Sequence, residues 1–325
     1  MPKGLTKIVI NAQELTLTAI MKTILITGGT GLVGRALTNA LLAQGHHVII
    51  MSRKKQETNN PQLTYAAWNV EQQTIEAAAI SRADYIVHLA GAGVADKRWT
   101  AARKKEIANS RVLSGQLLAK ALSEIPNKVK AVVSASAIGW YGPDPSVPSP
   151  HPFTEEAPPH NDFLGNTCRQ WEQSTEPLTA NGIRLVKLRI GIVLSTAGGA
   201  LKEFVKPLRF GVATVLGSGR QVVSWIHIDD LVQLFIYAME NEQLSGVYNA
   251  VAPQPVTNRQ LIKAIARSRH RFYITLPVPA FVLKLMLGEM SIEVLKSATV
   301  SANKIQQAGF AFRYAGVEEA MKSFF

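Results

Sequence analysis

Short apolar runs alternate with helical patterns through the first two-thirds of the chain. Runs typical of buried strands occupy residues 23–27, 47–51, 63–67, 84–90, 129–134 and 183–194, and helical spacing of apolar positions occupies 35–44, 100–123 and 161–180. Strands that alternate with helices predict a parallel sheet that is covered by helices on both faces. The pattern therefore predicts an α/β protein with a doubly wound parallel sheet.

Residues 27–34, TGGTGLVG, follow the first predicted strand and open the first predicted helix. The spacing Gly28, Gly31, Gly34 fits a phosphate-binding turn. The first two glycines let the backbone approach a pyrophosphate, and the third lets helix and strand pack closely. The helix N-terminus would donate N–H groups to the anion. We expect a Rossmann-type dinucleotide site here, with Thr30, Leu32 and Val33 also beside the cofactor.

The end of the second predicted strand distinguishes NAD(H) from NADP(H). It reads Ile50-Met51-Ser52-Arg53-Lys54-Lys55 and contains no acidic residue. An acid at this place bonds the ribose hydroxyl of NAD(H), whereas an arginine receives the 2′-phosphate of NADP(H). Ser52 and Arg53 therefore predict that NADP(H) is preferred over NAD(H).

The pattern of elements changes after Gly198-Gly199. We expect an extension at 1–20, a dinucleotide-binding domain at 21–197, and a smaller mixed substrate or lid region at 198–325, some of whose segments return to the first domain. The stretch 142–159 holds many prolines and is expected to be a loop near the site. The apolar stretch 276–288 is expected to contain a helix at 279–287 and to act as a lid or an oligomer contact, with a membrane role as the weaker alternative.

Composition narrows the function classes. The chain has 325 residues, a net charge of +12 and one cysteine. A single cysteine excludes an intramolecular disulfide and a cysteine-rich metal site, and no metal is expected. The basic excess predicts a solvated helix face or a groove that attracts an anionic ligand, because no nucleic-acid-binding motif accompanies it. We expect a soluble cytoplasmic protein, a monomer or homodimer, with a small-molecule ligand and no nucleic-acid or membrane partner.

Four segments in this order carry a family resemblance: TGGTGLVG at 27–34, HLAG at 88–91, SASAIGWYG at 134–142 and HIDD at 227–230. The chain resembles the extended short-chain dehydrogenases and, more narrowly, the atypical "epimerase family proteins" that carry a C-terminal domain of unknown function. The narrower resemblance rests on residues 90–112, 171–172, 217–231, 276–291 and 308–314. It implies that Leu89, Ala90 and Gly91 border the cofactor.

The resemblance also implies a catalytic serine, tyrosine and lysine, but this chain lacks the tyrosine and the lysine. Alignment on Glu172 places Leu164 at the tyrosine position and Cys168 at the lysine position, while Ser136 keeps the serine position. Ser136 and Tyr141 are the predicted catalytic residues. Other candidates for proton transfer are Lys97 or Arg98, His227, Glu172 and Cys168. Each has a structural alternative: a packed aromatic for Tyr141, solvated charges for Lys97 and Arg98, a helix-start histidine for His227, a helix-surface or capping residue for Glu172, and a small buried residue for Cys168.

Three tryptophans are expected to converge above the nicotinamide: Trp99, Trp140 and Trp225. With Lys97 and Arg98 they would form a substrate pocket, and Arg103 or Arg111 would anchor an anion; the alternative is that each tryptophan fills the core. The sequence thus predicts an atypical NADP(H)-binding oxidoreductase acting on a small carbonyl or hydroxyl compound. The alternative is a non-catalytic NADP(H)-responsive protein that positions the C-terminal region for a partner.

Overall fold

The computed structural model describes residues 21–54, 56–269 and 272–325, so the predicted extension at 1–20 lies outside the described residues. Its main feature is an eight-stranded sheet in the order β12-β7-β6-β5-β1-β2-β3-β4. All neighbours in this sheet are parallel except β3 and β4, so the predicted parallel α/β sheet is confirmed. The strands are β1 (Thr23–Thr27), β2 (His47–Ser52), β3 (Leu63–Asn69), β4 (Thr74–Ile75), β5 (Tyr85–His88), β6 (Ala131–Ala137), β7 (Arg184–Ile190) and β12 (Gly246–Ala250).

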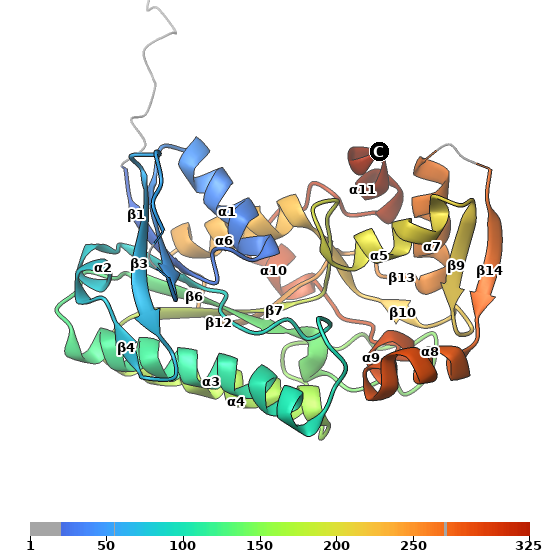
Figure 1. Cartoon of the computed structure of the whole chain (residues 1–325), viewed down its shortest axis with the longest axis horizontal. Helices are drawn as coiled ribbons and strands as arrows, with labels where there is room; N and C mark the ends of the chain where they lie inside the picture. The colour runs from blue at the N-terminus through green and yellow to red at the C-terminus, as the bar shows by residue number, and fades with distance from the viewer. Residues whose placement is uncertain (1–20, 55, 270–271) are drawn as a thin grey trace, which may run out of the picture.

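Helices cover both faces of this sheet (Figure 1). Helices α1 (Leu32–Ala43) and α6 (Ile228–Glu240) pack together on one face, and α3 (Ala101–Glu124) and α4 (Phe163–Thr175) pack together on the other. The short helix α2 (Ala77–Arg82) precedes β5. Alternate residues of β1 belong to separate cores: Ile24 and Ile26 contact the α6 side, and Leu25 contacts the α3 side. This two-sided burial explains why the strands read as continuous apolar runs.

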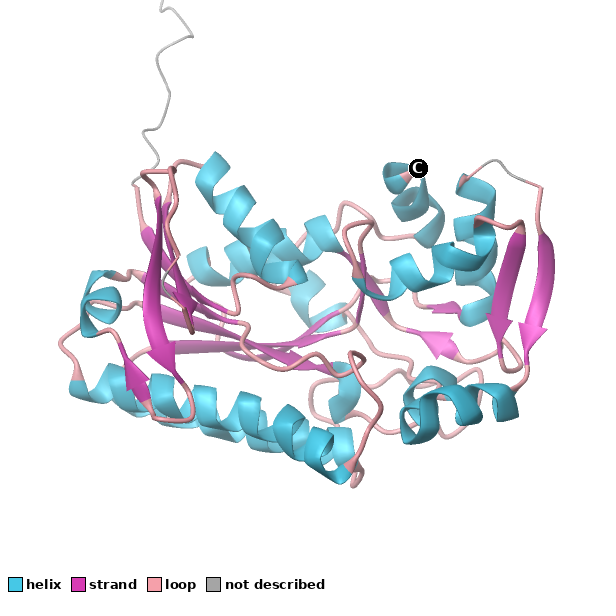
Figure 2. Cartoon of the chain, viewed as in Figure 1, coloured by secondary structure: helices cyan, strands magenta, loops and turns pink. Residues whose placement is uncertain are grey.

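The rest of the chain forms a smaller lobe with three two-stranded sheets (Figure 2). The strand pairs are β8 (Ile192–Leu194) with β11 (Trp225–His227), β9 (Val212–Leu216) with β14 (Ile274–Val278), and β10 (Val222–Val223) with β13 (Val256–Thr257). Its helices are α5 (Gly199–Leu208), α7 (Asn258–Ser268), α8 (Ala280–Leu287), α9 (Ser291–Leu295) and α11 (Val317–Phe324). Helix α10 (Asn303–Gln307) instead packs on β12, and its Ile305 joins the core beneath α1 and α6. A third core, which includes Leu201, Leu261 and Met321, holds α5, α7 and α11 together. Both β12 and α6 lie beyond Gly198 in the chain, yet they join the large sheet and its covering layer.

Two predicted elements differ from the observed ones. The single strand expected at 183–194 is divided by Gly191 into β7 and β8, and β8 leaves the large sheet to pair with β11. A Cβ at Gly191 would lie 2.6 Å from the Ser224 carbonyl oxygen, so only glycine allows this close passage. The helix predicted at 279–287 is confirmed as α8, whereas Leu276, Pro277 and Val278 before it pair with β9 as part of β14.

The helix expected at 161–180 also differs from the observed one. The α-helix ends at Thr175, and the chain continues as a 3-10 helix over Glu176–Asn181. Pro177 lies at the start of that segment, where the missing amide hydrogen is tolerated. In the described residues, no helix is both long enough and apolar enough to span a membrane.

Candidate functional site

The glycine turn lies between β1 and α1, at the carboxyl edge of the large sheet. Gly28 adopts a positive φ of 70°, and a Cβ there would lie 2.7 Å from the Leu89 carbonyl oxygen. At Gly34 a Cβ would lie 2.4 Å from the Gly28 carbonyl oxygen, so this glycine lets α1 pack directly on the turn. Both positions require glycine for different reasons, the first for its backbone conformation and the second for close packing.

The N-terminus of α1 offers hydrogen-bond donors without a side-chain cap. Gly31 precedes the helix, and the first turn contains no acidic residue. The amides of Leu32, Val33 and Gly34 therefore have no acceptor within the helix, as in any first turn, and the helix dipole adds partial positive charge. A helix N-terminus of this kind suits a pyrophosphate. Leu32 also lies near Gly198 and Gly199 at the start of α5, so the small lobe borders the turn.

A buried polar network supports the turn from beneath. The Thr27 Oγ1 accepts hydrogen bonds from the backbone amides of Leu89 and Ala90, at 3.1 and 3.2 Å. Its hydroxyl hydrogen is then directed to the Nδ1 of His88, 2.8 Å away, and the His88 Nε2 lies 3.4 Å from the Ser114 hydroxyl. Burial lowers the pKa of His88 to about 4, so the ring is neutral at pH 7. The network joins the ends of β1 and β5 to α3.

The end of β2 lies beside the glycine turn, because β2 pairs with β1. Ser52 closes the strand, and its hydroxyl accepts from the Lys54 amide at 3.3 Å. Arg53 and Lys54 are exposed. Among the described residues, Arg53 forms no hydrogen bond or ion pair that would occupy its guanidinium. Ser52 and Arg53 therefore lie at the carboxyl end of β2, beside the glycine turn.

The loop after β5 is fixed by side chains of α3 and by its own tryptophan. Three consecutive carbonyl oxygens are hydrogen-bonded: that of Ala92 by Arg111, that of Gly93 by Arg103, and that of Val94 by the Trp99 indole. Since Leu89, Ala90 and Gly91 precede these residues directly, the wall predicted to border the cofactor is attached to α3.

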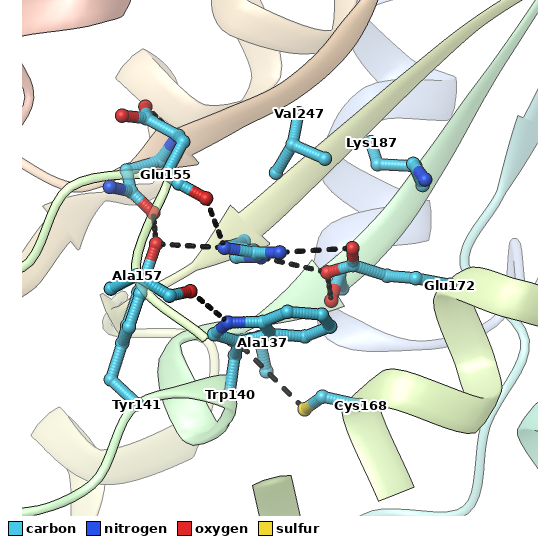
Figure 3. Close-up of polar contacts among 12 residues, drawn as sticks. Ala137, Trp140, Tyr141, Glu155, Ala157, Cys168, Glu172, Lys187 and Val247 are labelled. Carbon is cyan, nitrogen blue, oxygen red and sulfur yellow. Dashed lines mark hydrogen bonds and ion pairs between the residues drawn. The ribbon is translucent and has the colours of Figure 1, made fainter. Parts of the chain in front are cut away.

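A second polar group, which we call the Glu172 cluster, consists of Ser136, Tyr141, Glu172, Arg189 and Asn249 (Figure 3). The Arg189 Nε and Nη2 donate to the two oxygens of Glu172 at 2.8 and 3.1 Å, in a bidentate pair whose side chains are 3% and 6% exposed. The guanidinium also lies 3.6 Å from the centre of the Trp140 ring. The pair is therefore both desolvated and held on an aromatic face.

The hydroxyls of both predicted catalytic residues are bound within this cluster. Ser136 donates to Glu172 at 2.7 Å, and Tyr141 donates to the Asn249 side-chain oxygen at 2.7 Å while accepting from Arg189 at 3.1 Å. Tyr141 is fully buried, and burial raises its pKa to about 12. These contacts argue against Tyr141 as a proton donor and favour the alternative of a packed aromatic. Ser136 keeps its lone pairs but has its proton directed inward.

The remaining candidates for proton transfer are either held by structural partners or, like Lys97, exposed. His227 caps α6, and its Nδ1 accepts from the Asp229 amide at 3.0 Å, which matches the structural alternative. Cys168 is buried, with its pKa raised to about 12 by that burial, and it points to the Ala137 carbonyl oxygen. Lys97 is exposed, and Arg98 is exposed and donates to the Leu285 carbonyl oxygen at 3.4 Å. Leu164 lies against Gly139.

The three tryptophans do not converge. Trp99 makes an edge contact with Phe163 at 5.0 Å, and Trp140 bonds the Ala157 carbonyl oxygen beside the Glu172 cluster. Trp225 is fully buried in the core of the small lobe, where its indole donates to the Gln254 carbonyl oxygen. The prediction that Trp225 lines the substrate pocket is therefore wrong. Trp225 fills the core because its strand, β11, lies in the small lobe. Within the described ranges, no group of acidic, histidine and cysteine side chains could hold a metal ion.

Sequence reasoning missed Arg189 and Asn249. Arg189 lies in the run RLVKLRI of β7, where a cation in a buried strand suggests a carboxylate partner elsewhere in the chain. This was a usable signal for a buried ion pair, but it does not identify Glu172 as the partner; the sequence offered Glu172 as a proton-transfer candidate, a helix-surface residue or a cap. Asn249 gave no signal, because its partner Tyr141 comes from a distant segment.

Comparison with known proteins agrees with this geometry. Residues 24–250 match the NAD dependent epimerase/dehydratase family, and residues 278–324 match a domain of unknown function, DUF1731. The epimerase family protein YfhF of Bacillus subtilis is 38% identical over 299 residues, which cover 92% of this chain and 96% of that protein. A relative from Staphylococcus haemolyticus, epimerase family protein SH2119, is 37% identical over 93% of this chain and 98% of its own length.

Among solved structures, the human epimerase family protein SDR39U1 (isoform 2), determined with NADPH, is 30% identical with a TM-score of 0.81 and covers 93% of this chain and 98% of that one. A nucleoside-diphosphate sugar epimerase from Corynebacterium glutamicum is 32% identical with a TM-score of 0.74, over 94% of this chain and 58% of that one. The chain therefore belongs to the NAD dependent epimerase/dehydratase family, as an epimerase family protein with a C-terminal DUF1731 domain.

Proposed function

We propose that this protein binds NADP(H) at the glycine turn and is an atypical short-chain dehydrogenase-like oxidoreductase acting on a small carbonyl or hydroxyl compound. The observation that carries the proposal is the pairing of an uncapped α1 N-terminus with Arg53 at the end of β2. The first suits the pyrophosphate, and the second suits a 2′-phosphate that NAD(H) lacks. The human relative determined with NADPH supports the same choice of cofactor.

The residues present fit such a cofactor. Gly28 and Gly34 leave no room for a Cβ, and the Thr27 network fixes the Leu89 and Ala90 amides beside the turn. When bound, NADPH supplies a hydride equivalent to a carbonyl carbon. The chain's own contribution is to hold the dinucleotide along the carboxyl edge of the sheet and to keep the wall after β5 in place.

A second candidate function follows from the state of the proton donors. Ser136 and Tyr141 direct their hydroxyl hydrogens to Glu172 and Asn249, and burial keeps Cys168 a neutral thiol. These observations favour a non-catalytic protein in which bound NADP(H) sets the position of the small lobe, which contacts the turn through Leu32. A hydride transfer that takes its proton from water is the alternative within the oxidoreductase proposal.

Titration with NADPH and NADH tests the cofactor assignment. Arg53→Ala should weaken NADPH binding by about 2 kcal/mol, roughly thirtyfold, because it removes a charge-assisted contact to the 2′-phosphate, and should leave NADH binding unchanged. Lys54→Ala is the matched control for loss of one exposed neighbouring cation, and its effect should be much smaller. Equal affinities of the wild type for NADPH and NADH would show that Ser52 and Arg53 do not bind the 2′-phosphate.

NADPH oxidation with a panel of aldehydes, ketones and quinones separates the two candidate functions. Turnover above background supports the oxidoreductase. Tight NADPH binding without turnover across the panel supports the non-catalytic alternative.

A further inference from the structure

Two arginines of α3 differ in how their charges are satisfied. Arg103 lies 2.7 Å from a Glu106 oxygen and 3.6 Å from an Asp96 oxygen. Arg111, two turns further along, donates through Nη1 to two neutral carbonyl oxygens, those of Ala92 and Ile107, both at 2.9 Å. In the part of the chain that the structure describes, no carboxylate lies within ion-pair distance of Arg111. Its charge is therefore uncompensated, although the side chain is mostly removed from water.

The surroundings of Arg111 are shaped for a flat cation. Its guanidinium lies 4.9 Å from the centre of the Trp171 ring, and a Cβ at Gly91 would lie 3.0 Å from its Cζ. The indole N–H of Trp171 is buried without a hydrogen-bond partner in the described residues. Burial keeps the pKa of the neighbouring Cys168 thiol at about 12, so this group supplies no negative charge. Two adjacent groups thus have donor capacity that no acceptor among the described residues uses.

The position of Arg111 relates it to the proposed cofactor. Gly91, against which the guanidinium packs, follows β5, and β5 lies between β1 with its glycine turn and β6, which carries Ser136. A dinucleotide that begins at the end of β2 and crosses the turn would extend its nicotinamide half toward β5 and β6. Arg111 therefore lies beside the segment after β5, toward which the nicotinamide half and a reacting compound would extend.

We infer that Arg111 binds the carboxylate of the substrate, so that the substrate class is a carboxylated carbonyl or hydroxyl compound. This inference rests on the proposed function. A guanidinium that keeps its Nε and Nη2 donors unused can hold a carboxylate in bidentate fashion. A charge that is partly desolvated without a counter-charge gains most from an anionic ligand, because that ligand offsets the cost of its burial. Arg103 also has a buried Nε without a partner in the described residues, but Glu106 and Asp96 already supply its counter-charge, so it does not need an anionic ligand.

The test compares benzoate with benzamide, which share a ring and differ in charge. Their binding to the NADPH-saturated protein is measured by ligand-observed NMR at constant ionic strength. The wild type should bind benzoate about tenfold more tightly, the discrimination expected for one charge-assisted contact. Arg111→Gln should abolish this preference, and Arg111→Lys should retain part of it. Ser110→Ala is the control for loop displacement, because Ser110 accepts from the Ala92 amide and carries no charge; it should keep the preference.

No preference for benzoate in the wild type, or an unchanged preference in Arg111→Gln, overturns the inference. The cofactor is the other possible source of an oxygen ligand, and titration with NADPH and with 2′,5′-ADP distinguishes it. If Arg111→Gln weakens NADPH but not 2′,5′-ADP while the benzoate preference persists, Arg111 serves the nicotinamide half and the inference is wrong. NADPH titration of the same wild-type sample tests the proposed function separately, because absence of NADPH binding refutes that function whatever benzoate does.

Discussion

Two polar regions lie along the same edge of the large sheet, and they differ in whether their hydrogen-bonding capacity is used. At the glycine turn, the first amides of α1 and the Arg53 guanidinium are directed outward with no acceptor within the described chain. In the Glu172 cluster, Arg189 is bound by Glu172, Tyr141 and the Glu155 carbonyl oxygen, and Tyr141 by Asn249. The first region is suited to bind a ligand, and the second to hold β6, β7, β12 and α4 together.

The largest expected effect on stability comes from breaking the Glu172 cluster. Glu172→Gln removes the counter-charge of the buried Arg189, so the free energy of unfolding should fall by about 3–5 kcal/mol. Urea denaturation measures this. Glu203→Gln is the control, because Glu203 pairs with Lys206 at the surface and its loss should cost less than about 1 kcal/mol. Equal costs for the two variants would mean that the cluster does not stabilise the fold as described.

The next effect concerns the support beneath the glycine turn. Because burial lowers the pKa of His88 to about 4, the unfolded chain takes up a proton first as the pH falls below its ordinary value near 6.5. The stability that His88 provides is therefore complete above pH 6.5 and is lost as the pH falls toward 4, by about 3 kcal/mol in all. Burial also lowers the pKa of His227 to about 4, so it adds a loss in the same direction.

His88→Asn isolates the contribution of this one residue. The asparagine oxygen can replace Nδ1 as the acceptor for Thr27, and it does not titrate. The free energy of unfolding should fall less steeply between pH 7 and pH 4 in the variant, because the variant lacks the one proton that His88 takes up on unfolding. Identical pH profiles would show that His88 is not held neutral in the folded protein.

The smallest expected effect on stability comes from removing one hydroxyl from the Glu172 cluster. Tyr141→Phe should cost about 1 kcal/mol of stability, because Asn249 loses its donor while Arg189 keeps Glu172. NADPH affinity should stay within about twofold of the wild type, within the usual scatter for independent sites. A large loss of NADPH affinity would contradict the separation of the two regions.

The sequence predicts the large sheet better than it predicts the small lobe, and the reason is physical. Strands buried on both faces, such as 47–51, read as apolar runs whatever their neighbours are. In contrast, β14 pairs with β9 although its alternating apolar residues Ile274 and Leu276 are exposed, and its Pro277 weakens the local signal for a strand. Short elements whose partners come from distant segments cannot be assigned from local pattern alone.

The same distinction applies to the site. The glycine turn is local, so spacing alone locates Gly28, Gly31 and Gly34 correctly at the β1–α1 turn. The Glu172 cluster joins residues from β6, α4, β7 and β12. Their pairing depends on the order of strands in the sheet. Resemblance assigned Ser136 a catalytic role that its bond to Glu172 does not support, because the hydroxyl proton faces the core.

The most direct test of the account measures NADPH affinity and stability together in Arg53→Ala and Glu172→Gln, at a temperature at which both variants are folded. The account predicts opposite outcomes: Arg53→Ala loses about thirtyfold in NADPH affinity with unchanged stability, and Glu172→Gln loses stability with NADPH affinity nearly unchanged. If folded Glu172→Gln fails to bind NADPH, or if Arg53→Ala binds it as the wild type does, the assignment of cofactor binding to the glycine turn and of structural support to the Glu172 cluster is contradicted.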